Sequence, residues 1–287
     1  MALTAAQIAQ FAPLLMIHPE ERFYPMDPVE FIRNSRFKHH RGWARDEGYN
    51  RNTRSWVGGD NKTADYYDPP VSFVNSFSPW KNNENRRPKD PHCGGHWNVF
   101  LQPEGHQIGE TDPNGKVPVS YYAKDVDTSS IPEADRKRFR IEVETYTRIS
   151  YWWFFGYNEA PALSHQGDWE HVTMKVKEGQ IVGVWYSAHE PPPRFYPLNE
   201  LKRDQSGRVI VFCAKGTHAS YPQPGKYPLL AGAKDHASAG GYAWDVSGEL
   251  KNLLSQPWRD YAGAWGEVGE THYSTGPLGP WHKRYTP

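Results

Sequence analysis

Two carboxylates and two imidazoles lie within seven residues in the run HQGDWEH, residues 165–171. Directly after this run, apolar and polar residues alternate as in a half-buried strand. Side chains two apart share one face of a strand, so Asp168 and Glu170 project together with the apolar residues that follow. Burying an ionised carboxylate without a partner is costly. Two carboxylates at the start of a buried strand face therefore predict a nearby cation.

A divalent metal ion is one cation that this spacing could hold. His165 lies three residues before Asp168, on the expected loop into the strand, where its ring can fold over the strand end. A neutral imidazole with the carboxylates of Asp168 and Glu170 suits a partly hydrated ion. The loop after the preceding strand offers Asn158 and Glu159 nearby. Because oxygen ligands dominate, the pattern favours Mg²⁺, Ca²⁺ or Mn²⁺ over Zn²⁺.

Further histidines follow two later strand candidates. His189 comes after the strand expected over 181–188, and His218 follows the strand expected over 208–214. If either ring reaches the acidic pair, it could act as a general acid or base beside a metal-bound water. The sequence leaves open whether the site is catalytic or only binds a ligand.

Structural roles compete with each of these assignments. Asp168 and Glu170 could instead form a buried salt bridge with a basic side chain. Alternation places His171 on the opposite face of the strand, where a structural role is favoured. Trp169, His171 and Tyr221 complete the candidate set, as residues expected to contact a ligand.

Other catalytic motifs are missing. The sequence has no Gly-x-Ser-x-Gly elbow, no phosphate-binding loop and no dinucleotide fingerprint. Cys93 and Cys213 are the two cysteines, too few for a disulfide scaffold, and their pairing is left open. The run His92-Cys93-Gly94-Gly95-His96 lacks the four spaced ligands of a structural zinc site.

Composition predicts the fold that must position these residues. The 287-residue chain has 25 Gly, 25 Pro and 14% aromatic residues, and few of its stretches have helical periodicity. Such chains build β-sandwiches or barrels with long loops. We expect a single domain over 1–287, a mostly antiparallel β-sandwich with a few short peripheral helices. Its core strands would lie within about 117–215, and a polar, loop-rich region would span about 42–91.

Local patterns give the individual elements. The spacing of Thr4 and Gln7 predicts a capping box that opens a helix over about 4–15. Alternation predicts a long strand over 141–155 and a second over 169–177, joined to a third by a hairpin at 177–180. Short helices are expected over 132–138 and 246–254, and a short strand over 117–122.

Charge balance and apolar content limit the partners. With 33 basic and 33 acidic residues, the chain has no net field that would attract nucleic acid. No window approaches the roughly 18 apolar residues of a membrane-spanning helix. The first residues lack the features of a secretory signal. We expect a soluble chain, cytoplasmic or secreted by a route without a signal, and the sequence leaves its localisation unknown.

Several motifs resemble one family along most of the chain. These are SHQGDWEHVTMKV, VWYSAHE, VIVFCAKGTHASYP, GGYAWDV and AGAWGEVG, with the opening APLLMIHPEERFYPMDPVEFI. They resemble the vacuolar protein sorting-associated protein 62-like family. This resemblance implies a β-sandwich and does not imply a defined chemistry.

A second resemblance covers mainly the central third. The metal motif Gly-His-Arg-His-Asp-Trp-Glu of the necrosis-and-ethylene-inducing-peptide-like cytolysins is similar to the run 165–170, with the second histidine of the motif replaced by Gly167. Carried over, the motif implies metal binding by His165, Asp168 and Glu170. A further acidic ligand of that family would fall near Asn158 or Glu159. Those cytolysins use the cation in binding a sphingolipid head group.

The functional hypothesis follows from the residues and these resemblances together. We expect a divalent-cation-dependent protein that recognises an anionic or polyhydroxyl head group of a lipid or glycan, with membrane targeting or cytolysis as the roles this would serve. The alternative is a metal-dependent hydrolase of a phosphoester or glycan, with His189 and His218 as acid and base. Neither hypothesis involves nucleic acid, and the membrane contact would be at its surface.

Overall fold

A computed structural model gives the fold of the chain. It describes residues 3–40, 48–50, 55–57, 63–67, 99–112, 116–139, 141–160, 164–189, 193–229, 232–261, 263–267 and 276–283. Most of the expected loop-rich region at 42–91 lies outside these residues, as do Cys93 and the histidines beside it. None of the helices in the described part has the length and apolar composition needed to span a bilayer.

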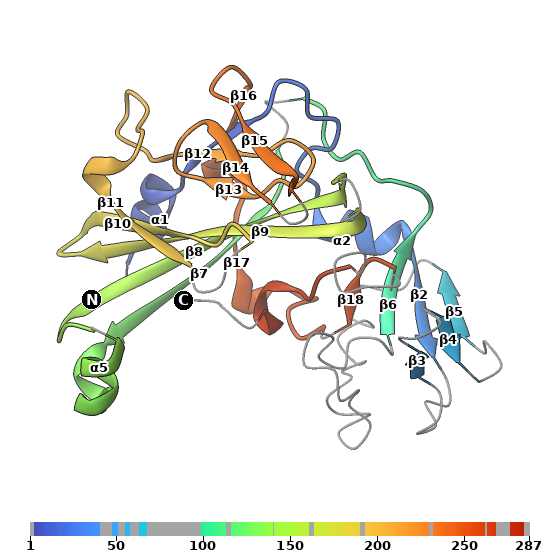
Figure 1. Cartoon of the computed structure of the whole chain (residues 1–287), viewed down its shortest axis with the longest axis horizontal. Coiled ribbons are helices and arrows are strands. Elements are labelled where there is room, and N and C mark those ends of the chain that lie inside the picture. Colours follow the sequence, from blue (N-terminus) through green and yellow to red (C-terminus); the bar gives the residue numbers. More distant parts are fainter. Residues whose placement is uncertain are drawn as a thin grey trace.

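Two sheets pack face to face and form the main body (Figure 1). The first has the strand order β11-β10-β9-β8-β7-β17, and the second has the order β13-β12-β1-β16. The bounds of the first are β7 Val119–Asp127, β8 Thr145–Asn158, β9 His165–Lys177, β10 Gln180–Tyr186, β11 Arg194–Pro197 and β17 Leu250–Asn252. Those of the second are β1 Leu14–Ile17, β12 Ile210–Cys213, β13 Ser220–Tyr221 and β16 Tyr242–Asp245. The expected β-sandwich is confirmed.

Most neighbouring strands in these two sheets run antiparallel, as expected. The exceptions are β1 beside β12 and β17 beside β7, which are parallel pairs. The hairpin from β9 to β10 turns at Glu178 and Gly179, both with positive φ, at 51° and 74°. This is the backbone of a two-residue hairpin turn that matches the strand twist. The hairpin predicted at 177–180 is therefore confirmed.

The space between the two sheets is filled by apolar side chains. From the larger sheet, Val172, Met174 and Val176 of β9 project into this core. Leu15, Val211 and other residues of the smaller sheet meet them from the opposite side. These side chains have almost no exposed surface, so burying each one stabilises the fold by roughly 1.5–3 kcal/mol.

A second, aromatic core covers one end of the other face of the larger sheet. Trp152 and Trp169 of the sheet pack there against rings from the C-terminal segment and from helix α2 (Pro28–Arg33). Those partners are Phe31, Trp258, Tyr261 and Trp265. This second core explains why Trp152 and Phe154 interrupt the alternation of β8, because both faces of the strand are buried at this point.

The remaining strands form smaller sheets. A four-stranded sheet has the order β18-β6-β2-β5, and the pairs β14-β15 and β3-β4 are separate. Their bounds are β2 Ser35–His40, β3 Gly48–Asn50, β4 Ser55–Val57, β5 Thr63–Tyr67, β6 Val99–Pro103, β14 Gly225–Pro228, β15 Lys234–Ala237 and β18 Ala264–Trp265. Two further helices are α1 Ala5–Phe11 and α5 Glu133–Phe139. The helices are short and peripheral, as expected.

The N-terminal helix, the long strand and the helix near the C-terminus differ from their predictions. The capping box at Thr4 is present, but the helix ends at Phe11 because Pro13 follows and the next residues form β1. The strand predicted from residue 141 begins at Thr145, and Val143 is 63% exposed. The helix predicted over 246–254 is wrong: this segment forms a 3-10 turn, strand β17 and a second 3-10 turn. Pairing of β17 with β7 outweighs its leucine pattern.

Candidate functional site: a buried acid and histidine cluster

The first residues of β9 place the acidic pair inside the sandwich. Asp168 is buried, with 5% of its surface exposed, and Glu170 is partly buried on the same face. Trp169 and His171 lie on the opposite face, where the His171 ring stacks on Trp152 at 3.8 Å between centroids. The alternation inferred from the sequence is therefore observed in the strand.

His165 is not on a loop, because β9 extends back to it. Its Nδ1 donates a hydrogen bond to the Gly167 carbonyl at 2.8 Å, and burial lowers its pKa, so the ring is neutral at pH 7. Gly167 has φ 66°, and its backbone lies so close to Trp265 that a Cβ would clash. His165 also lines a pocket of about 190 Å³ with His106 and other polar residues.

The partner of Asp168 is a histidine that lies 50 residues away in the chain. His218 Nδ1 donates to Asp168 Oδ2 at 3.0 Å, and Asn158 Nδ2 donates to the same oxygen at 3.3 Å. Asn158 also donates to the Thr217 carbonyl, which fixes the turn that carries His218. Two charge-assisted donors thus hold one carboxylate oxygen.

A second carboxylate meets the other side of His218. Its Nε2 lies 3.6 Å from Glu21 Oε1, and both side chains are at most 2% exposed. The Glu21 carboxylate also accepts from the Gly216 and Phe23 backbone amides. The His218 ring stacks on the Phe155 ring, with 3.7 Å between the centroids. The backbone of His218 has a positive φ of 55°. Positive φ in a non-glycine residue costs free energy, and such residues cluster at functional sites.

Charge explains why this arrangement is stable. Burial alone would lower the pKa of His218, but the hydrogen bond to Asp168 and the charges of Asp168 and Glu21 outweigh it and raise that pKa to about 9. Burial alone would raise the pKa of Glu21, but His218 and the two backbone amides hold it at about 2. The same histidine holds the pKa of Asp168 below its usual range, against the effect of burial. At neutral pH, one imidazolium therefore bridges two carboxylates.

Glu170 behaves differently from its neighbour. Burial, and then the charge of Asp168, raise its pKa to about 8, although His189, His218 and Lys283 act in the opposite direction. At neutral pH Glu170 is mostly protonated, so it can donate a hydrogen bond while Asp168 only accepts. Two carboxyl groups on one strand face thus hold different protonation states, a pattern typical of functional sites.

A second histidine and carboxylate pair lies near Glu170. His189 Nε2 donates to Asp235 Oδ2 at 2.8 Å, and 34% of the His189 side chain is exposed. Burial alone would lower the pKa of His189, but the hydrogen bond and charge of Asp235 raise it above its usual range. Asp235 is fixed by donors from Thr217 at 2.8 Å and Tyr221 at 2.7 Å. Like His218, His189 has positive φ, at 49°.

The predicted metal ligands do not come together as a metal site. Among the residues that the structure describes, no group of three or more His, Cys, Asp or Glu side chains could hold a metal ion. His165 bonds to a carbonyl, and Glu159 accepts from the Arg22 guanidinium near the surface. Asn158 turns its amide nitrogen toward Asp168 and leaves its Oδ1 buried without a partner in the described chain. The buried imidazolium of His218 supplies the positive charge that the sequence assigned to a metal.

The other predicted residues divide between the two faces. The structure separates Trp169 and His171 from the cluster, because both lie in or beside the aromatic core. Tyr221 belongs to the cluster through Asp235. Cys213 is buried as a free thiol, and burial raises its pKa well above the usual value.

Sequence reasoning missed Glu21, Asp235 and Thr217. Glu21 stands in the irregular segment between β1 and α2, where no periodicity marks it as buried. Asp235 does lie on a strand with alternating burial, but that strand is only four residues long. The family-like segment around residue 21 is the only sequence signal that pointed toward this region.

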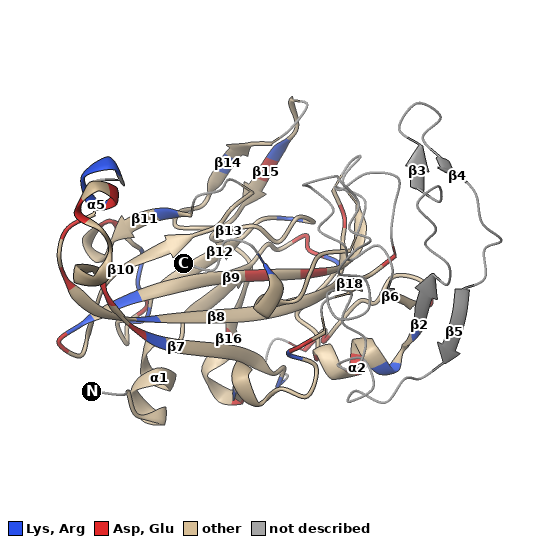
Figure 2. Cartoon of the chain, turned by 90° about the horizontal axis from the view of Figure 1, so that it is seen from below, with Lys and Arg blue, Asp and Glu red and all other residues tan. Residues whose placement is uncertain are grey.

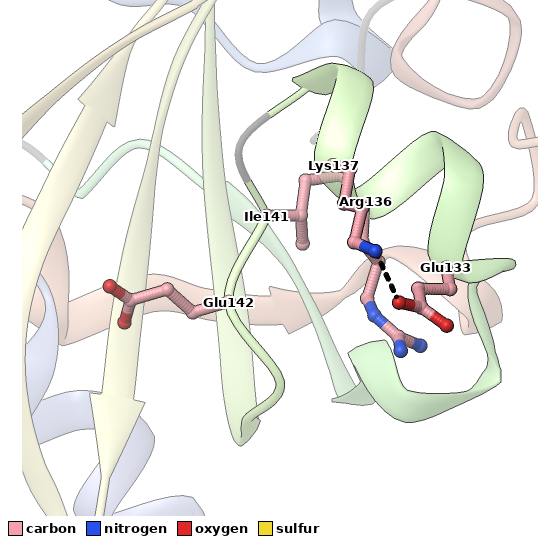
Figure 3. Close-up of a pocket in the computed structure, with 5 residues that line it drawn as sticks. All are labelled: Glu133, Arg136, Lys137, Ile141 and Glu142. Carbon is pink, nitrogen blue, oxygen red and sulfur yellow. Dashed lines mark ion pairs between the residues drawn. The ribbon is translucent and has the colours of Figure 1, made fainter.

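A hollow of about 480 Å³ lies far from this cluster, beside helix α5. It is lined by Glu133, Arg136, Lys137, Ile141 and Glu142 (Figure 3). Lys137 and Glu133 form an ion pair at 2.6 Å, and the Arg136 guanidinium donates to the Ser129 and Ile131 carbonyls. Figure 3 shows Glu142 pointing away from the other four side chains. These charged groups pair with each other and with nearby backbone carbonyls, so we assign no function to this hollow.

Comparison with known proteins confirms the resemblance to one family. The model of the vacuolar protein sorting-associated protein 62 family matches residues 144–265. "Putative vacuolar protein sorting-associated protein TDA6" of Saccharomyces cerevisiae is 22% identical, covering 96% of this chain and 66% of its own length. Vacuolar protein sorting-associated protein 62 of the same yeast is 21% identical, over 89% of this chain and 58% of its own length. The chain thus spans about two thirds or less of these relatives.

Solved structures similar to this chain include toxin folds. Necrosis and ethylene inducing protein 2 from the agent of cocoa's witches' broom disease has 14% identity and a TM-score of 0.38, covering 91% of this chain and 79% of its own. The protein NLPPya in complex with glucosamine has 12% identity and a TM-score of 0.40, covering 90% and 79%. The β-sandwich assignment rests on the strand order and the two packed sheets described above.

Proposed function

We propose that the chain recognises a small, oxygen-rich head group of a lipid or glycan at the mouth of the cluster, beside Glu170 and His189. One observation carries the proposal: burial and the charge of Asp168 raise the pKa of Glu170 to about 8, so its carboxyl carries a proton at neutral pH and can donate a hydrogen bond. Beside it, Asp235 raises the pKa of His189 above its usual value, which favours the protonated ring as a second donor. Hydroxyl, phosphate and carboxylate oxygens are the acceptors that such a pair would bind.

The surroundings support binding by holding these donors in place. Asp235 is only 2% exposed and fixes one nitrogen of the His189 ring, which leaves the other for a ligand. Thr217 and Tyr221 fix Asp235 in turn. Binding sites gain affinity when their polar groups are oriented before the ligand arrives. The 34% exposure of His189 gives a ligand access to that ring.

A divalent cation in this site stays a prediction from the sequence. The described donors do not fit a metal group, since His218 already neutralises Asp168 and Glu21. The proposed recognition therefore uses no metal. Recruitment of the chain to a membrane surface, or action as a cytolysin, would depend on which molecule carries the head group.

Hydrolysis of a glycan or phosphoester is the second candidate. It is favoured by the opposite pKa shifts of Asp168 and Glu170 on one strand face. In this mechanism Glu170 would donate a proton to the leaving group, and His189 would activate a water in those molecules whose ring is neutral. His218 is enclosed and would orient Asp168 without touching the substrate.

Binding of soluble head-group probes tests the proposal. Titrations of myo-inositol, glucuronate and glucosamine, followed by NMR, should give saturable shifts in wild-type protein. His189→Gln should weaken the affinity about tenfold, the effect of losing one charge-assisted hydrogen bond. Lys226→Gln, an exposed change on β14, is the matched control and should leave binding unchanged.

The same samples separate binding from catalysis. Nitrophenyl glycosides and nitrophenyl phosphate report turnover in wild-type protein and in Glu170→Gln. Turnover that disappears in Glu170→Gln while the probes still bind would favour the hydrolase. Absence of both turnover and saturable binding for all three probes would count against the proposed site.

A further inference from the structure

The other face of the larger sheet carries a row of basic residues on neighbouring strands. Lys124 on β7 stands directly opposite Arg148 on β8, and Arg148 stands directly opposite Lys175 on β9. We call these three residues the basic row. Figure 2 shows blue patches side by side on β7, β8 and β9, away from the red stretch of β9.

Three like charges in direct register are unfavourable for a sheet. Like-charged residues directly opposite each other destabilise a strand pair. Glu144 offsets part of the repulsion, because it pairs with Lys175 and, at 2.9 Å, with Lys177. Among the residues that the structure describes, no carboxylate pairs with Lys124 or Arg148. The row therefore keeps an unbalanced positive charge at β7 and β8.

Arg148 is the centre of the row. Its Nε is buried and has no hydrogen-bond partner in the described chain. Tyr122 and Tyr146 lie two positions away along the strands, on the same face and near the guanidinium. Lys175 Nζ lies 4.7 Å from the Tyr146 ring centre. A half-buried guanidinium whose Nε has no hydrogen-bond partner is costly, and it is a ready donor for an anion.

The rim of this region is aromatic. The Trp185 and Phe195 rings lie 5.0 Å apart, and Lys175 Nζ lies 5.7 Å from the centre of Phe195. Phe195 is 38% exposed and lies across Gly183, which stands beside Lys175 in the sheet. These rings could pack against the carbon skeleton of a ligand whose charged group reaches the basic row.

We propose that the basic row binds the phosphate group of a small, soluble phosphate monoester. Strands lie about 4.8 Å apart, so the three residues span about 10 Å, which suits one phosphate group and its first carbons. Arginine offers paired donors to phosphate oxygens, and lysines add point charges. A flat membrane surface fits less well, because the Lys175 side chain is only 14% exposed.

The site is independent of the proposed head-group site. The basic row lies on the opposite face of the sheet from Asp168 and Glu170, which project into the core between the sheets. Changes in one site can therefore be read without disturbing the other. His189→Gln should leave the phosphate site unaffected, and Arg148→Gln should leave the head-group site unaffected.

Calorimetric titration of glycerol 3-phosphate and of inorganic phosphate tests the inference. Both should bind wild-type protein saturably and more weakly as salt is raised. Arg148→Gln should reduce the affinity about tenfold or more, and Lys124→Gln several-fold. Arg148→Lys should recover part of the loss. Lys226→Gln, which removes a lysine outside the larger sheet, should bind as wild type does.

The outcomes separate the inference from its rivals. If Arg148→Gln does not fold, the exposed Lys124→Gln variant still decides the question. Equal affinity in wild-type and Lys124→Gln protein, or no saturable binding of either probe, would overturn the inference. The last measurement is binding to vesicles of phosphatidylcholine with and without phosphatidic acid. Binding to the anionic vesicles without any binding of the soluble ester would also overturn the inference.

Discussion

His218 and His189 each form a hydrogen-bonded pair with an aspartate, and the two pairs are built alike. Each has positive φ, each is bonded to a buried aspartate, and each has a raised pKa. They differ in enclosure: the His218 side chain is 1% exposed and touches two carboxylates, while that of His189 is 34% exposed and touches one. The comparison indicates that enclosure turns one pair into a structural charge bridge and leaves the other available to a ligand.

The two histidines should differ most in how much stability is lost when each is replaced. His218→Gln leaves the buried carboxylates of Asp168 and Glu21 without their cation, so we expect a loss of roughly 3–5 kcal/mol in the free energy of unfolding. His189→Gln should cost about 1 kcal/mol, because Thr217 and Tyr221 still donate to Asp235. Urea unfolding at pH 7 measures both. Equal losses in the two variants would contradict the assignment of different roles.

The change in stability with pH should be smaller than the loss caused by His218→Gln, and it should come mainly from titration of the same His218 ring. The pKa of His218 rises from 6.5 to about 9 on folding, so its contribution is complete below pH 6.5 and is lost as pH rises through 9. That contribution is on the order of 3 kcal/mol. The raised pKa of Glu170 acts in the same direction between about pH 4.5 and 8.

Unfolding experiments at several pH values check this expectation. Wild-type protein and His189→Gln should both lose stability between pH 6.5 and 9. His218→Gln should show a shallower decline over that range, since only the contribution of Glu170 and smaller terms remain. Proton NMR gives a direct control, in which the His218 ring should stay protonated beyond pH 8. A stability that rises over this pH range would be inconsistent with the charge bridge.

The smallest effect should come from removing divalent cations. Because His218 balances Asp168 and Glu21, EDTA should leave the melting temperature of wild-type protein unchanged. Elemental analysis of the purified protein, with Asp168→Ala as the comparison, measures any bound metal. A stoichiometric metal that disappears in Asp168→Ala would instead support the prediction made from the sequence.

Local patterns were enough to predict much of the fold. The hairpin at 177–180 and the capping box at Thr4 depend on neighbouring residues, and both are present. The leucine pattern over 246–254 failed, because pairing of this segment with β7 outweighs its weak helical preference. Predictions held where the deciding contacts are close in sequence, and failed where a distant strand competes.

For the site, the sequence by itself determined which side chains share a face. Alternation in β9 sends Asp168 and Glu170 into the sandwich and His171 to the other side, since this depends only on strand geometry. It also predicted that the buried acids need a positive charge. The identity of that charge was decided by the tertiary structure, which brings Glu21 and His218 to Asp168 from distant segments. Strand geometry is local, whereas the partners of a buried carboxylate depend on which elements pack against it.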